Sequence, residues 1–244
     1  MKEEISKSVF ITGIGTDVGK TLVSAIIAQA LGYDYWKPIQ CGSLEFTDSD
    51  DVKSIVNAED TGIHKETYRL KEPMSPHAAA ERESIEIDLE KFSLPTQSKT
   101  RNQSQTLEQN EHTITKTNIT TANEISSSKN IVVEGAGGLL VPLNSKHTIL
   151  DLIIKLNLPV VVVVKNYLGS INHSLLSISQ LKNTGCKIIG IIISGEANRE
   201  SEEIIEKLSG EKIIFRVPFI KEIKRKMIVE IAEQFKQTCG KYFK

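Results

Sequence analysis

Cysteine is scarce in this 244-residue sequence, and its three copies, Cys41, Cys186 and Cys239, lie far apart. No C-x-x-C pair occurs, so the spacing gives no sign of a metal knuckle or a redox motif, and a reducing compartment fits best. No apolar stretch approaches the length that crosses a bilayer, and no apolar segment typical of a secretory signal precedes residue 9. We therefore expect a soluble, cytoplasmic protein without a membrane partner.

The sequence also lacks an excess of charge of either sign. Thirty Lys and Arg residues are set against 31 Asp and Glu residues, which leaves a net charge of -1. Nucleic-acid binding is favoured by a strong positive field, so no nucleic-acid partner is expected. With 39% hydrophobic residues, the chain is long enough to bury one large core, and we expect a single domain over residues 1–244.

Short β-branched runs alternate with stretches of helical periodicity. Strands are expected at residues 9–12, 131–134, 160–164, 188–193 and 213–217, and helices at residues 20–31, 148–156, 172–184, 200–208 and 222–235. The strand at 160–164 is apolar throughout, as strands buried on both faces are. The alternation predicts an α/β fold with a doubly wound, mostly parallel sheet flanked by helices, and ligands at the carboxyl ends of its strands.

Residues 96–129 depart from this alternation. Of these 34 residues, 21 are Ser, Thr, Asn or Gln, and the few large apolar residues bury too little surface to offset the ordering entropy of the segment. We expect a polar, mobile surface insertion, and we assign it no chemistry.

The strongest motif is GIGTDVGKTL, residues 13–22, between the first expected strand and the first expected helix. It matches a phosphate-binding loop except that Gly13 lies one residue earlier than the usual spacing requires. In such a loop, backbone N–H groups and the helix N-terminus surround a polyphosphate. Lys20 then reaches the β- and γ-phosphate oxygens, and Thr21 ligates Mg²⁺.

Four further stretches lie where strands end or helices begin. Lys37, in WKPIQCG, is placed to carry a positive charge into the crevice, although a solvated edge lysine is the simpler interpretation of that stretch alone. The run DSDD at residues 48–51 either caps a helix or supplies a Mg²⁺ ligand, and the sequence leaves both open. Glu134 ends a buried strand ahead of GAGG, where an unpaired carboxylate is unfavourable, so a metal or phosphate role is favoured over a plain turn. The stretch LGSINH, residues 168–173, opens a helix whose free N–H groups suit a carboxylate.

Taken together, these stretches resemble the dethiobiotin synthetase family, ATP-dependent enzymes of biotin biosynthesis with a P-loop NTPase-type fold. The resemblance covers nearly the whole chain outside the insertion and rests on GIGTDVGKT, WKPIQCG, an acidic Ser-Asp, EPMSPHAAA, VEGAGGLLVPL, LGSINH and a terminal VPF. The phosphate loop of that family has the same longer glycine spacing. The resemblance implies closure of the ureido ring of dethiobiotin from 7,8-diaminononanoate and CO₂, through a carbamate that ATP phosphorylates, with Mg²⁺ as cofactor.

The resemblance also implies roles for individual residues. Lys20 and Lys37 would be catalytic and would stabilise the carbamate and the γ-phosphate. The Mg²⁺ ligands would be Thr21, Asp50 and Glu134. The ATP-binding residues would be Asp17, Val18, Gly19, Lys20, Thr21, Leu22, Asp50, Glu134, Gly135, Ala136, Gly137, Ser194, Gly195, Val217, Pro218 and Phe219. The substrate-binding residues would be Thr16, Asp17, Cys41, Gly169, Ser170, Ile171 and Asn172. The last four would bind the carboxylate of a substrate held in the active site of the opposite subunit of a homodimer.

Two positions depart from the family's pattern. Cys41 stands where some relatives carry a serine hydroxyl, which weakens a substrate hydrogen bond. Ser194 stands where relatives often carry an asparagine that contacts the nucleotide base, so we expect relaxed base specificity, with the base read mainly by backbone groups near residues 217–219.

The alternative to a synthetase is a partition or division-site ATPase, which gates assembly instead of making a product. Such proteins resemble this sequence in fold and loop but carry a second lysine early in the phosphate loop. Ile14 occupies the equivalent position here, which favours the synthetase.

Overall fold

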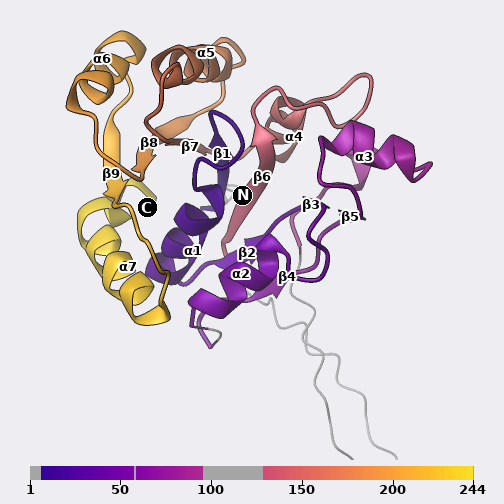
Figure 1. Ribbon diagram of the computed structural model, residues 1–244, viewed down its shortest axis with the longest axis horizontal. Coiled ribbons are helices and arrows are strands. Elements are labelled where there is room, and N and C mark those ends of the chain that lie inside the picture. Colours follow the sequence, from indigo (N-terminus) through magenta and orange to yellow (C-terminus); the bar gives the residue numbers. More distant parts are fainter. Residues whose placement is uncertain (1–6, 58, 96–128, 244) are drawn as a thin grey trace, which may run out of the picture.

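A seven-stranded parallel sheet lies at the centre of the computed structural model, which describes residues 7–57, 59–95 and 129–243 (Figure 1). In spatial order its strands are β4 (Ile63–His64), β2 (Asp34–Trp36), β6 (Ile131–Gly138), β1 (Val9–Gly13), β7 (Val160–Val164), β8 (Ile188–Ser194) and β9 (Ile213–Val217). The chain therefore starts mid-sheet and builds outward on both sides of β1. This order confirms the predicted doubly wound α/β fold.

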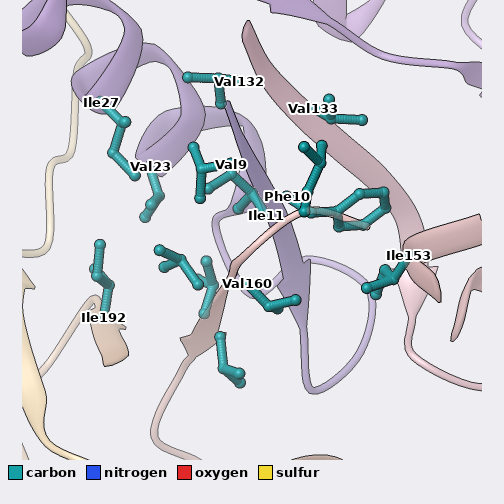
Figure 2. Close-up of a cluster of buried hydrophobic side chains, with 14 of the residues drawn as sticks. Val9, Phe10, Ile11, Val23, Ile27, Val132, Val133, Ile153, Val160 and Ile192 are labelled. Carbon is teal, nitrogen blue, oxygen red and sulfur yellow. The ribbon is translucent and has the colours of Figure 1, made fainter. Parts of the chain in front are cut away.

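Helices cover both faces of the sheet. Figure 1 shows α1 (Lys20–Leu31), α2 (Asp48–Ile55) and α7 (Arg225–Cys239) on one side, and α4 (Ile149–Leu156), α5 (Ser170–Asn183) and α6 (Arg199–Ser209) on the other. Successive side chains of a strand point to opposite faces, and all five residues of β1 are buried because both faces of the sheet are covered. In Figure 2, Val9 lies toward Val23 of α1 and Phe10 toward Ile153 of α4. Two covered faces explain the unbroken apolar runs in the sequence.

The predicted boundaries agree with the structure to within two residues for all but two of the predicted elements, and these two differ by more for identifiable reasons. The predicted strand at 131–134 continues to Gly138 because its glycine-rich end pairs with β1, where Gly13 lies opposite Gly138. The helix predicted at 222–235 begins at Arg225 and ends at Cys239. Residues 221 and 222 form a bend instead, and the last turn is retained because the side chain of Cys239 is buried.

A smaller part of the fold has no counterpart in the sequence-based prediction. β3 (Ile39–Cys41) and β5 (Tyr68–Leu70) form a second, two-stranded parallel sheet. α3 (Pro76–Arg82) and a 3-10 helix, η1 (Leu89–Lys91), follow it. These elements lie beyond the carboxyl end of β2 and place Cys41 near the phosphate loop.

The predicted insertion lies, apart from residue 129, outside the described residues. Within the described ranges, no helix combines the length and the apolar character that a membrane crossing requires.

Candidate active site

The phosphate loop connects β1 to α1, and its conformation requires glycine at residue 19. Gly19 is the N-cap of α1 and has a φ of 95°, in the left-handed region that favours glycine. A Cβ atom there would collide with the hydroxyl oxygen of Ser194. The loop is therefore packed directly against the carboxyl end of β8.

Lys20 is folded along this loop instead of extending into solvent. Its Nζ atom donates a hydrogen bond to the backbone oxygen of Gly15 at 2.9 Å, and the residue is only 7% exposed. Burial lowers the pKa of Lys20 to about 8, an effect that the negative charge of Glu134 opposes and the positive charge of Lys37 reinforces. An anion bound in the loop would favour the charged form of this lysine.

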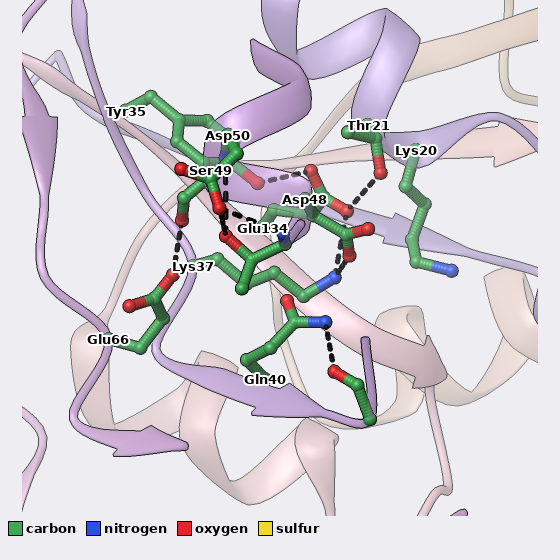
Figure 3. Close-up of polar contacts among 12 residues, drawn as sticks. Lys20, Thr21, Tyr35, Lys37, Gln40, Asp48, Ser49, Asp50, Glu66 and Glu134 are labelled. Atoms are coloured by element: carbon green, nitrogen blue, oxygen red, sulfur yellow. Dashed lines mark hydrogen bonds and ion pairs between the residues drawn. The ribbon is translucent and has the colours of Figure 1, made fainter. Parts of the chain in front are cut away.

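The carboxylate of Glu134 lies at the centre of the site and is 1% exposed (Figure 3). Its Oε1 atom accepts a hydrogen bond from Thr21 Oγ1 at 2.8 Å and lies 3.3 Å from Lys37 Nζ. Its Oε2 atom accepts a hydrogen bond from the hydroxyl of Tyr35 at 2.8 Å. The buried carboxylate is thus paired on both oxygens, as its burial within β6 requires.

The strand pairing explains why these side chains meet. β2 and β6 are parallel neighbours in which Tyr35 lies opposite Val132. Because side chains alternate along a strand, Tyr35, Lys37, Val132 and Glu134 point to the same face of the sheet. That face is covered by α1, whose first turn contributes Thr21.

Asp50, which the family resemblance assigns to Mg²⁺, takes part in the N-terminal capping box of α2. Its Oδ2 atom accepts hydrogen bonds from the backbone nitrogen and the hydroxyl of Thr47, at 2.9 and 2.8 Å, and the hydroxyl of Thr47 accepts one from the Asp50 backbone nitrogen. This capping box starts α2, and the bonds from Thr47 lower the pKa of Asp50. A metal role for Asp50 stays a prediction and would use the other carboxylate oxygen.

The two neighbouring carboxylates are directed differently. Asp48 forms an ion pair with Lys37, the same ammonium that contacts Glu134 (Figure 3). Burial raises the pKa of Asp51, and the negative charges of Asp50 and Glu134 add to the rise. Asp48 and Asp51 therefore both interact with the cluster around Glu134, which the sequence alone did not indicate.

The oxygen atoms gathered here fit Mg²⁺. A hydroxyl from Thr21 and carboxylates from Glu134 and Asp48 are hard ligands of the kind that Mg²⁺ prefers. The ammonium of Lys37 lies between these two carboxylates, which shows that the location favours a cation. Among the described residues, no cluster of three or more His, Cys, Asp or Glu could hold a metal by itself. An ion here would therefore complete its shell with nucleotide and water oxygens, as Mg²⁺ commonly does.

A cavity of about 420 Å³ opens beside Lys37. Thr16 and Asp17 of the phosphate loop line it together with Cys41 of β3, the three residues expected to border the diamine. Burial raises the pKa of the Cys41 thiol to about 11, an effect that Lys37 opposes, so the thiol is protonated at neutral pH. Residues 73–76, which lead into α3, also line the cavity.

Comparison with known proteins identifies the family. A family model described as an AAA domain matches residues 7–227. The ATP-dependent dethiobiotin synthetase BioD of Christiangramia forsetii is 44% identical over 237 residues, which cover 96% of this chain and 98% of that protein. This chain belongs to the dethiobiotin synthetase family. The protein of the same name from Cytophaga hutchinsonii is 39% identical over 226 residues, covering 93% of this chain and 95% of its own length.

A solved structure with the same fold comes from a different functional class. The cell division ATPase MinD of Pyrococcus furiosus superposes with a TM-score of 0.52 at 11% identity, covering 95% of this chain and 99% of that one. At so low an identity the likeness shows the fold alone. It supports the predicted P-loop NTPase-type architecture of this dethiobiotin synthetase family member.

The residues that the family pattern assigns to the nucleotide base lie together at the ends of β8 and β9. Ser194 lies opposite Val217 in the sheet, and the backbone nitrogen of Gly195 donates to the Val217 oxygen at 2.9 Å. Phe219 is 68% exposed just beyond. Since Ser194 is packed against Gly19, these strand ends form the side of the phosphate loop away from Lys37.

Residues 169–172 are not brought to the cavity beside Lys37. Gly169 is the N-cap of α5, and Gly169 and Ile171 line a different hollow of about 370 Å³ together with residues 196–198. Within one chain, the segment expected to hold the substrate carboxylate therefore lies outside the cavity expected to hold the diamine.

The structure adds residues to the site that sequence reasoning missed. Tyr35 contacts Glu134, and residues 73–76 line the cavity. Asp48, which the sequence offered only as one member of the run at 48–51, pairs with Lys37. The sequence held one usable signal for Tyr35, because it lies two residues before Lys37 on a strand and must share its face. The stretch EPMSPHAAA contributed only to the family resemblance, and no local pattern placed it beside Cys41.

Proposed function

We propose that this protein closes the ureido ring of dethiobiotin from 7,8-diaminononanoate and CO₂, with ATP as the phosphoryl donor and Mg²⁺ as the cofactor. The supporting observation is the position of Lys37. Its ammonium contacts Glu134 beside the phosphate loop, and its side chain lines the 420 Å³ cavity. The ammonium of Lys37 thus lies between the expected nucleotide site and the expected small-molecule site, where a phosphoryl group would be transferred from one to the other.

The proposed reaction needs positioning and charge neutralisation more than covalent help from the protein. One amine of the substrate takes up CO₂ as a carbamate, whose oxygen attacks the γ-phosphorus and releases ADP. The second amine then attacks the carbonyl carbon of the mixed anhydride, closing the ring and releasing phosphate. Lys37 would neutralise the carbamate and Lys20 the β- and γ-phosphates. Mg²⁺, held by Thr21, Glu134 and a carboxylate of α2, would supply further neutralisation of the phosphates.

The activity is tested by supplying diaminononanoate, bicarbonate and MgATP and measuring dethiobiotin by mass spectrometry. Product is expected from the wild type and from Lys53→Met, a control that removes an exposed lysine on α2. Lys37→Met is expected to lose the activity while still binding ADP. Absence of dethiobiotin with the folded wild type, at any substrate concentration, would refute the proposal.

The shared active site is proposed from the same geometry. Residues 169–172 lie outside the cavity, and an apolar groove of about 520 Å³ runs from Gly15 and Thr16 to α5. Leu140 and Leu176 line this groove and are 61% and 62% exposed. A second copy of this chain would cover these leucines and could present its own α5 N-terminus to the cavity, giving a homodimer.

Subunit mixing tests this arrangement. Asn172→Ala and Lys20→Ala each disable a different half of a shared site, so each variant alone is expected to be inactive. After subunits exchange at equal concentrations, about half of the dimers are mixed and each has one intact site, which predicts about a quarter of wild-type activity. No recovery in dimers proven to be mixed would show that each site is built within one chain.

The alternative of a partition or division-type ATPase has less support. Ile14, at the position where such proteins carry a second lysine, is apolar and 8% exposed in the hydrophobic core. ATP hydrolysis without the diamine, together with no dethiobiotin, would favour that alternative. The single-domain organisation and the cytoplasmic location remain predictions.

A further inference from the structure

Tyr35 is fully buried, and its hydroxyl, the one polar group of its side chain, is hydrogen-bonded to the carboxylate of Glu134. Its exposed fraction is 0%, and its hydroxyl donates to Glu134 Oε2 at 2.8 Å. Both groups are removed from water, so neither has solvent as an alternative partner. The bond therefore restrains the carboxylate orientation more than a bond at the surface would.

The two oxygens of Glu134 are used by different partners. Oε2 is bonded to Tyr35, which lies deep on β2, whereas Oε1 faces Thr21 and Lys37 at the mouth of the site (Figure 3). A cation that entered beside the phosphate loop would meet Oε1. Rotation of the carboxylate away from this arrangement would break the Tyr35 bond.

The ring of Tyr35 is itself held in place. It forms a small apolar cluster with Ala25 of α1 and with Val52 and Val56, on α2 and at its end. The same two helices contribute Thr21 and Asp48 to the site. Packing thus links the position of the hydroxyl to both elements that surround Glu134.

We infer that Tyr35 is a positioning residue for the Mg²⁺ site, which orients Glu134 so that Oε1 is directed toward the metal. This inference rests on the proposed function and on the proposed metal role of Glu134. A hydrogen bond to the second oxygen of a ligating carboxylate is the kind of outer contact whose loss commonly weakens metal binding by about 10- to 100-fold.

Tyr35→Phe tests the inference because it removes only the hydroxyl. Mn²⁺ binding in the presence of ADP is followed by the electron paramagnetic resonance of free Mn²⁺, and ADP binding is measured separately in EDTA. We expect Tyr35→Phe to weaken Mn²⁺ binding by about 10- to 100-fold while metal-free ADP binding stays within about twofold. A general structural loss would weaken both.

Tyr33→Phe is the matched control. Tyr33 is also buried, and its hydroxyl lies 3.4 Å from the backbone oxygen of Phe243, outside the site. Its removal is expected to leave Mn²⁺ binding within about twofold of wild type. Equal Mn²⁺ affinity in Tyr35→Phe and Tyr33→Phe would overturn the inference.

A second measurement uses the wild type and so does not depend on how well a variant folds. In a crystal structure with Mn²⁺ and ADP, Tyr35 is expected to remain on Oε2 while Oε1 contacts the ion. A broken Tyr35 bond in that complex would overturn the inference. Failure of the proposed function would give a different result. The wild type would then make no dethiobiotin, while Mn²⁺ binding and its dependence on Tyr35 would be unchanged.

Discussion

Nucleotide affinity is expected to fall as the pH rises above 8, because free Lys20 loses its proton there. Burial holds the pKa of Lys20 at about 8 in the ligand-free protein, well below the usual value of 10.5. Bound phosphates add negative charge around Nζ and raise that pKa, so the complex keeps its proton at a pH where the free protein does not. Affinity supported by this charge is fully present below pH 8 and is lost progressively above it.

The size of the effect follows from the fraction of Lys20 that is charged. At one pH unit above its pKa, roughly a tenth of the free lysine is protonated, so the dissociation constant should increase by about tenfold for each unit above pH 8. Binding at high pH must then be accompanied by proton uptake, which approaches about one proton per site. The increase continues until the pH reaches the pKa of the complex.

Calorimetric titration of ATP in EDTA at pH 7.5, 8.5 and 9.5, in pairs of buffers with different ionisation enthalpies, measures both quantities. Lys20→Arg is the control, because a guanidinium stays charged throughout this range and should give a flat profile. A wild-type dissociation constant that is the same at pH 7.5 and 9.5, or the same slope in Lys20→Arg, would refute the reasoning.

Three further predictions concern the metal, the loop and the base. Lys37→Met removes the ammonium that competes for Glu134, so Mn²⁺ should bind more tightly by paramagnetic resonance while turnover falls by about a hundredfold or more; weaker Mn²⁺ binding would contradict this. Gly19→Ala should lower the free energy of unfolding by about 1–3 kcal/mol and abolish ATP binding, whereas Gly15→Ala, with no atom near its added Cβ, should not destabilise the fold in chemical denaturation. GTP and CTP should support turnover within about a hundredfold of ATP in kcat/KM, and a preference for ATP above about a thousandfold would show that the base is read more strictly.

The longer strands of the main sheet and the helices that flank it were predictable because each has a local signal, whereas the short strands β2 and β4 of the same sheet were not among the predicted ranges. β7 and β9 were predicted at their observed bounds from apolar, β-branched runs, and α1 from its position after the phosphate loop. β3 and β5 were not predictable, because each has only three residues and forms through pairing with the other. A three-residue strand is too short to show a period.

The acidic run of α2 shows where sequence reasoning stopped. The sequence left capping and metal binding open for residues 48–51. The structure shows that Asp50 completes the capping box of Thr47 while Asp48 pairs with Lys37, because a helix turns by about 100° per residue and directs nearby side chains apart. That division depends on where α2 lies relative to β2 and β6.

The sequence by itself determined the fold class, through periodicity, and the family, through a resemblance carried by seven motifs spread along the chain. It also predicted the chemistry of the phosphate loop from the spacing within one short segment. Only the tertiary structure decided which distant groups share Glu134. Thr21 and Glu134 are 113 residues apart in the chain, and Tyr35 and Glu134 are 99 apart, yet each pair forms a 2.8 Å hydrogen bond. Such contacts arise because parallel strands that are remote in sequence end side by side at one edge of the sheet, and no local pattern encodes which strands become neighbours.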